Sequence, residues 1–84
     1  MTYTVDFCKV LGGGLKISGG KFTDAADTGS ALKTGLNKVL ACFASCNTTA
    51  LAIGIKESAT AGTLTVYGET GADTDDGTWW AIGK

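Results

Sequence analysis

Apolar and polar residues alternate along most of this chain, with the two-residue period of half-buried β-strands. The first such segment spans residues 2–11, where Tyr3, Val5 and Phe7 share one face. Glycine-rich stretches interrupt the alternation and are typical of turns. The pattern predicts further strands at residues 15–18, 50–56, 62–67 and 79–83.

Two segments depart from simple alternation. In residues 31–39, Leu32 and Leu36 have the spacing of a helical face, but Gly35 interrupts a long helix. A short strand or single turn is expected there, and a helix of about two turns is the alternative. Residues 39–46 carry apolar side chains on both faces. This predicts a central strand covered on each side, or a strand whose outer face meets a partner.

Together these segments predict an all-β fold, namely a single small antiparallel β-sandwich or barrel of about six to seven strands. Thirteen glycines and the absence of proline fit this class. We expect one β-domain over residues 1–84. A chain of this length buries only about two-thirds of its unfolded surface, so oligomerisation is the expected aid to stability.

Residues 62–83 predict a closing hairpin with an acidic, glycine-rich turn. Trp79 has two interpretations, a surface residue or a core residue reached through a bulge at Gly77. With Trp79 at the surface, Tyr67 lies on the same exposed face. The core side of the hairpin is then expected to contain Leu64, Val66, Trp80 and Ile82.

Exposed aromatic residues on a small domain indicate association rather than chemistry. Tyr67 and Trp79 are therefore the leading interface residues, followed by Tyr3. Small side chains on one face of residues 50–56 permit close approach of another sheet or subunit. These further interface positions are Ala50, Ala52 and Gly54.

Charge and composition exclude several functions. Seven lysines oppose eight acidic residues without any arginine, which argues against a nucleic-acid partner. There is no histidine, the commonest general base, so we expect neither an enzyme nor a metal or cofactor site. The N-terminal residues do not resemble a signal peptide, and no apolar run approaches the ~20 residues that span a bilayer. We expect no membrane partner and synthesis in a reducing cytoplasm.

Three cysteines allow at most one disulfide. On a strand, Cys42 and Cys46 would lie roughly 13 Å apart, beyond bonding distance. Cys8 pairs with one of them only if neighbouring strands bring the two together.

Acidic residues crowd the tip of the expected hairpin, at Glu69, Asp73, Asp75 and Asp76. Aspartate and glycine are the ordinary residues of a β-turn, so the prediction is a solvated turn. A calcium site is the alternative, although the run does not match the EF-hand spacing.

Three segments resemble the small all-β virion proteins of tailed bacteriophages, of the head decoration or cement type. Asp27-Thr-Gly-Ser30 precedes Lys33-Thr-Gly-Leu-Asn-Lys-Val39, which is similar to their entry into a central strand. Gly62-Thr-Leu-Thr-Val-Tyr67 resembles their penultimate strand, and Trp79-Trp-Ala-Ile-Gly83 resembles their closing strand.

This resemblance implies a structural role on the virion, after synthesis in the host cytoplasm. The expected partners are other copies of the chain, as a homo-oligomer and by analogy a trimer, and the major capsid protein. Multivalent adhesion to the capsid lattice would then be the mechanism. Two alternatives remain: a tail or filament subunit, and a carbohydrate-binding module that stacks sugar rings on Tyr67 and Trp79.

Overall fold

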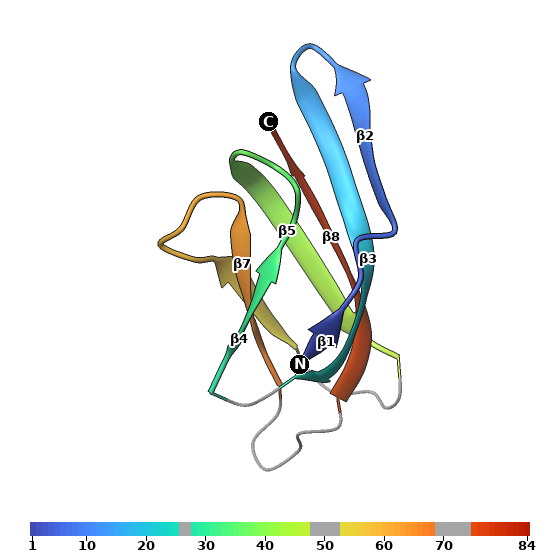
Figure 1. Ribbon diagram of the computed structural model, residues 1–84, viewed down its shortest axis with the longest axis vertical. Coiled ribbons are helices and arrows are strands. Elements are labelled where there is room, and N and C mark those ends of the chain that lie inside the picture. Colours follow the sequence, from blue (N-terminus) through green and yellow to red (C-terminus); the bar gives the residue numbers. More distant parts are fainter. Residues whose placement is uncertain (26–27, 48–52, 69–74) are drawn as a thin grey trace.

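Eight β-strands in two antiparallel sheets form the described part of the chain, and no helix occurs there (Figure 1). The computed structural model describes residues 1–25, 28–47, 53–68 and 75–84. The strands are β1 (Thr2–Tyr3), β2 (Phe7–Gly12), β3 (Leu15–Ala25), β4 (Ser30–Lys33), β5 (Val39–Cys46), β6 (Gly54–Glu57), β7 (Thr63–Tyr67) and β8 (Asp75–Gly83). The predicted all-β fold is confirmed as a sandwich, because the two sheets do not close into a barrel within these residues.

The larger sheet has five strands, and the last strand of the chain, β8, lies at its centre. β8 pairs with β3 on one side and with β5 on the other, while β1 and β2 both pair with β3. The smaller sheet has the order β4-β7-β6. In Figure 1 the β2–β3 hairpin extends beyond the smaller sheet, so the molecule is elongated, with extents of 41 × 23 × 18 Å.

The expected closing hairpin does not form. β7 pairs with β4 and β6, whereas β8 pairs with β3 and β5, so the chain crosses between sheets from one strand to the next. Leu64 and Val66 of β7 are fully buried, and so is Trp79 of β8. These side chains meet face to face across the interior instead of lying side by side in one sheet.

The expected single strand over residues 2–11 is divided in two. Between β1 and β2 the register against β3 shifts by one residue. The N–H groups of Thr4 and Asp6 still bond to β3, at the carbonyls of Lys21 and Gly19 (2.8 Å each). A shift of one residue exchanges the two faces of a strand, so Tyr3 and Phe7 lie on opposite faces. The prediction that they share a face is therefore wrong.

The two ambiguous segments are both strands. Residues 31–39 contain the end of β4, followed by a turn in which Gly35 has φ 85°, so the strand prediction is confirmed and the helix is wrong. Residues 39–46 form β5, as an edge strand of the larger sheet. A central position with cover on both sides was therefore wrong, and the outer face of β5 is exposed at Phe43.

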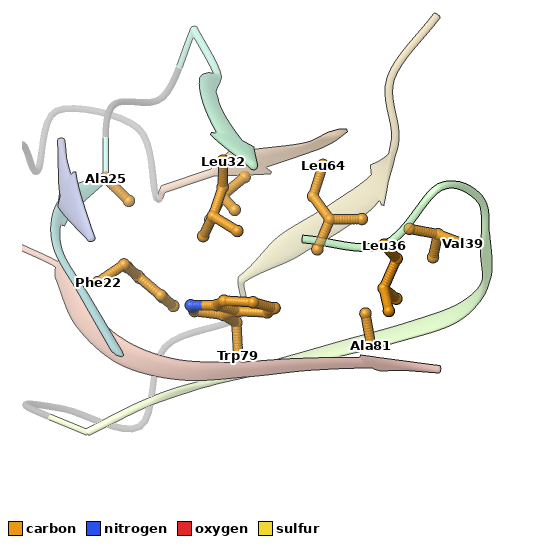
Figure 2. Close-up of a cluster of buried hydrophobic side chains, with 9 residues drawn as sticks. Phe22, Ala25, Leu32, Leu36, Val39, Leu64, Trp79 and Ala81 are labelled. Carbon is orange, nitrogen blue, oxygen red and sulfur yellow. The ribbon is translucent and has the colours of Figure 1, made fainter. Parts of the chain in front are cut away.

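Buried apolar side chains from both sheets fill the interior (Figure 2). Trp79 is the largest, and its ring lies in Figure 2 beside Phe22 and beneath Leu32 and Leu64. Its Nε1–H donates to the carbonyl of Thr4 at 3.1 Å, so the indole is both packed and hydrogen-bonded. The core comprises Phe22, Ala25, Leu32, Leu36, Val39, Leu64, Val66, Trp79 and Ala81.

The adjacent tryptophans face opposite ways. The prediction that Trp80 lies in the core is wrong. Trp79 is 0% exposed, which confirms its core interpretation, whereas Trp80 is 38% exposed on the outer face. Packing at Gly77 explains which tryptophan points inward. A β-carbon at Gly77 would clash with the Phe22 ring and the Ser45 carbonyl. Gly77 therefore faces inward, and alternation carries Trp79 inward with it.

Two buried hydroxyl groups are hydrogen-bonded in the interior, and one of them, that of Ser18, connects the sheets. Ser18 of β3 donates through Oγ to the carbonyl of Thr34, which follows β4. Thr34 Oγ1 donates to the Gly62 carbonyl at 2.7 Å and accepts the Leu36 N–H at 3.0 Å. These bonds satisfy buried polar groups that would otherwise oppose packing of the sheets.

Candidate functional site

A row of three aromatic side chains crosses the outer face of the larger sheet. Phe7 of β2 is opposite Gly19 of β3, Gly19 is opposite Trp80 of β8, and Trp80 is opposite Phe43 of β5. Residues directly opposite one another in antiparallel strands project from the same face. We refer to Phe7, Trp80 and Phe43 as the aromatic row.

Contacts inside the aromatic row hold its rings in place. The rings of Phe43 and Trp80 stack with centroids 4.4 Å apart and an interplanar angle of 26°. Phe7 lies over Gly19, since a β-carbon at Gly19 would be 2.6 Å from the Phe7 Cζ. Rings that are already ordered lose little conformational entropy when a partner covers them.

The aromatic row remains accessible, with 38% of Phe7, 38% of Trp80 and 47% of Phe43 exposed. An apolar row flanks it on one side and a polar row on the other. The apolar row contains Ile17, Ile82 and Ala41, with Lys9 at its end. The polar row contains Lys21, Thr78 and Ser45. An apolar centre with a polar margin is the usual composition of a protein interface.

Tyr67 and Trp79 do not share a surface. Tyr67 projects from β7 on the side opposite the buried Val66, on the outer face of the smaller sheet. It is half-buried, with Lys56 Nζ 5.9 Å from its ring centroid. Trp79 is enclosed in the core. A sugar platform built from these two rings is therefore wrong, because one of them has no exposed surface.

The other predicted interface residues are scattered. Tyr3 is half-buried at the margin between the sheets, and its hydroxyl accepts the N–H of Lys33 at 3.3 Å. Gly54 is exposed at the start of β6, opposite Tyr67. Ala50 and Ala52 lie outside the described residues. An interface role for Tyr3, Gly54 and the two alanines stays a prediction.

Sequence reasoning did not select the aromatic row, although it contained one signal for it. Phe43 belongs to the segment with apolar residues on both faces, for which a strand facing a partner was one interpretation. Trp80 was assigned to the interior, and the shift before β2 concealed the orientation of Phe7.

The three cysteines, all within described segments, form no disulfide. Cys8, Ser18, Ala81 and Cys42 stand in one row across the larger sheet. Three strand spacings, roughly 14 Å, therefore separate Cys8 from Cys42 and preclude a bond. Burial raises the pKa of the Cys42 thiol, and the negative charge of Glu57 adds to the increase.

Within the described ranges, no cluster of acidic, cysteine or histidine side chains has a metal-binding arrangement, and no pocket is present. Of the acidic residues predicted in a turn, Asp75 and Asp76 instead begin β8, and Glu69 and Asp73 lie outside those ranges. Asp76 Oδ1 accepts the N–H of Asp24 at 3.3 Å.

None of the described segments forms a helix with the length and apolar character needed to span a membrane.

Comparisons of the chain with protein-family models, with curated proteins and with solved structures gave no match.

Proposed function

We propose that this chain is a virion structural protein of the capsid-decoration type, which adheres to a capsid lattice through the aromatic row. The exposed, stacked pair of Trp80 and Phe43 carries this proposal. The resemblance of residues 27–39, 62–67 and 79–83 to phage decoration proteins supplies the biological setting. The working form is a homo-oligomer bound to the major capsid protein.

The composition of the outer face supports adhesion. Tryptophan is among the residues most enriched at binding hot spots, where loss of one side chain costs about 2 kcal/mol or more. Trp80 occupies the middle of the aromatic row, with Phe7 and Phe43 on either side to exclude water. A strand scaffold on both sides of β8 holds the rings rigidly, so binding requires little reorganisation.

A repeated lattice compensates for the small size of one such face. Each copy offers an apolar area of a few side chains, which alone gives a weak contact. When copies are linked in an oligomer, the second contact forms at a high effective concentration and overall binding increases by about 10²–10⁴-fold. Decoration of a capsid therefore does not require a tight single site.

The test is co-sedimentation of purified protein with shells assembled from the major capsid protein of the same genome. Trp80→Ser is expected to weaken binding by about 30-fold or more, the equivalent of a 2 kcal/mol hot spot. Tyr67→Ser is the matched control, because it removes an aromatic ring from the opposite face. Its binding should stay within about twofold of the parent protein, since a surface substitution away from the contact has little effect.

Circular dichroism of both variants checks that the fold is retained. If Tyr67→Ser abolishes shell binding while Trp80→Ser does not, the contact face lies on the smaller sheet and the proposal is wrong. Open-ended growth of the pure protein in light scattering would instead support a filament subunit over a decoration protein.

A further inference from the structure

We infer that two copies of this chain pair along β2, antiparallel, about a two-fold axis at Cys8. The two larger sheets then become one continuous sheet. This inference rests on the proposed function, because it identifies a second copy as the partner that makes adhesion multivalent. β-strand addition at an open sheet edge is a common mode of protein recognition.

β2 is an open edge of the larger sheet. It pairs with β3 on one side, and all six of its residues are exposed, with Val10 at 70%. Natural proteins usually protect such edges with charges, prolines or very short strands. β2 contains one charge, Lys9, and the chain contains no proline. The opposite edge, β5, instead lies near β6 of the smaller sheet.

Irregular backbone limits the pairing to a short window. The register against β3 shifts by one residue before Phe7, and a bulge interrupts it between Val10 and Gly12. Residues 7–10 are therefore the regular part of the edge. Bulges interrupt the ladder and twist the strand, so pairing should end where they begin.

Symmetry and charge then select one register. A two-fold axis perpendicular to the sheet keeps outward residues opposite outward residues and inward opposite inward. Within residues 7–10, two registers pair three residues of each copy: Cys8 opposite its own copy, or Lys9 opposite its own copy. Like charges directly opposite one another are destabilising, which excludes the second. In the first, Lys9 lies opposite Phe7 of the second copy, where its ammonium can approach an aromatic ring.

The edge strand β2 also carries Phe7, the first residue of the aromatic row, and this favours a second copy of the chain as the partner strand. Phe7 begins the row at β2, so the two-fold axis at Cys8 brings the two rows close together on the same face. The dimer then presents both rows on one ten-stranded sheet, twice the five strands of one copy. One short strand gives an interface below ~1,200 Å², so the pair should be weak in solution and reinforced on a lattice.

Cysteine cross-linking tests the register. In a background carrying Cys42→Ser and Cys46→Ser, Cys8 is the only thiol. Diamide should join two copies as a disulfide, since it takes up the two electrons and two protons that the thiols lose. Opposite residues in an antiparallel pair have Cα atoms about 4.5–5.5 Å apart, within the range a disulfide requires.

The matched control moves the thiol by two positions and keeps Lys9, with Cys8→Ser and Val10→Cys in the same background. In the inferred register the two introduced thiols are offset by four residues, with Cα atoms roughly 14 Å apart, so they should cross-link several-fold less. Equal or stronger cross-linking from position 10 than from position 8 would overturn the register.

Sedimentation equilibrium of unoxidised protein tests the pair itself. Cys8→Lys places two positive charges at the axis and should abolish dimer formation, whereas Ala31→Lys on the exposed edge of the smaller sheet should leave it unchanged. A parent protein that is monomeric at every concentration, or trimeric, overturns the inference. Shell binding that still depends on Trp80 in that case would leave the proposed function standing, so the two can fail separately.

Discussion

At the scale of single residues, Gly77 determines which side chains of β8 point inward. Gly77 lies in the same inward row as Trp79 and Ala81. The ring of Phe22 occupies the volume that a side chain at Gly77 would fill. Because Gly77 has no side chain, the Phe22 ring can pack against it, and this contact sets the direction of Trp79 and Trp80.

Gly77→Ala should destabilise the protein by about 1–3 kcal/mol, the usual range for overpacking a filled core. The added methyl would meet the Phe22 ring and the Ser45 carbonyl, and the backbone carbonyl cannot move freely. Urea denaturation measures the change. Gly54→Ala is the control, because its β-carbon would meet Tyr67 Cβ at an ordinary 3.4 Å, and its effect should stay within about 0.5 kcal/mol. Equal midpoints for the two variants would contradict the packing described for Gly77.

Cys42 predicts a decline of stability in alkali. Burial, together with Glu57, raises the pKa of its thiol above the ordinary value of 9.0. Above that pH the unfolded thiol loses its proton while the folded thiol retains it, so the free energy of unfolding falls as pH rises through the folded pKa. Below pH 9.0 the contribution is fully present.

Urea midpoints at pH 8 and at pH 10, on the two sides of that ordinary value, measure the effect. Cys42→Ala should lose less stability over this interval than the parent protein. Ala44→Ser changes the same inward face of β5 without removing a thiol, and should decline like the parent. An identical decline in all three proteins would mean that burial of Cys42 contributes nothing to the pH dependence.

At the scale of elements, the position of each strand sets its resistance to opening. β8 is hydrogen-bonded on both sides, to β3 and β5, while β2 has a partner on one side. Local opening of a sheet proceeds from its edges, because edge strands have fewer buried contacts.

Hydrogen exchange should therefore be slowest in β8 and much faster in β2 at low protein concentration. NMR of the exchanging amides reads both strands in one experiment. If β2 pairs with a second copy, its exchange should slow as concentration rises while that of β8 stays constant. Equal protection of the two strands in dilute protein would contradict the strand order.

The sequence predicted the strands better than their partners. Alternation correctly placed Leu64 and Val66 in the core, because packing demands apolar residues at every second position. It did not reveal that β7 and β8 belong to different sheets, since adjacency in sequence favours a hairpin and the period is identical in both arrangements.

For the candidate site, the sequence favoured Trp80 for the core and left Trp79 between core and surface, the reverse of the exposure in the structure. Both are large and apolar, and only the Phe22 ring above Gly77 distinguishes inside from outside. That contact joins strands far apart in the chain, which single-sequence patterns do not report. Phe43 was the recoverable member of the aromatic row, because its strand is apolar on both faces.

At the scale of the whole molecule, the sandwich has two unlike outer faces. One carries the aromatic row, and the other carries Tyr67 with Lys56 beside it. An elongated particle with one adhesive face can lie flat on a lattice and leave its other sheet towards solvent. This polarity agrees with the proposed decoration of a surface.

The central position of β8 also has a consequence in time. β3 and β5 are synthesised before β8, so neither strand can form its pairing with β8 until the end of the chain leaves the ribosome. Long-range pairing of this kind folds slowly and leaves unpaired edges exposed to other chains. On a crowded polysome, the β8 of a neighbouring nascent chain can enter the same gap, so the yield of correctly folded protein should fall as translation becomes denser.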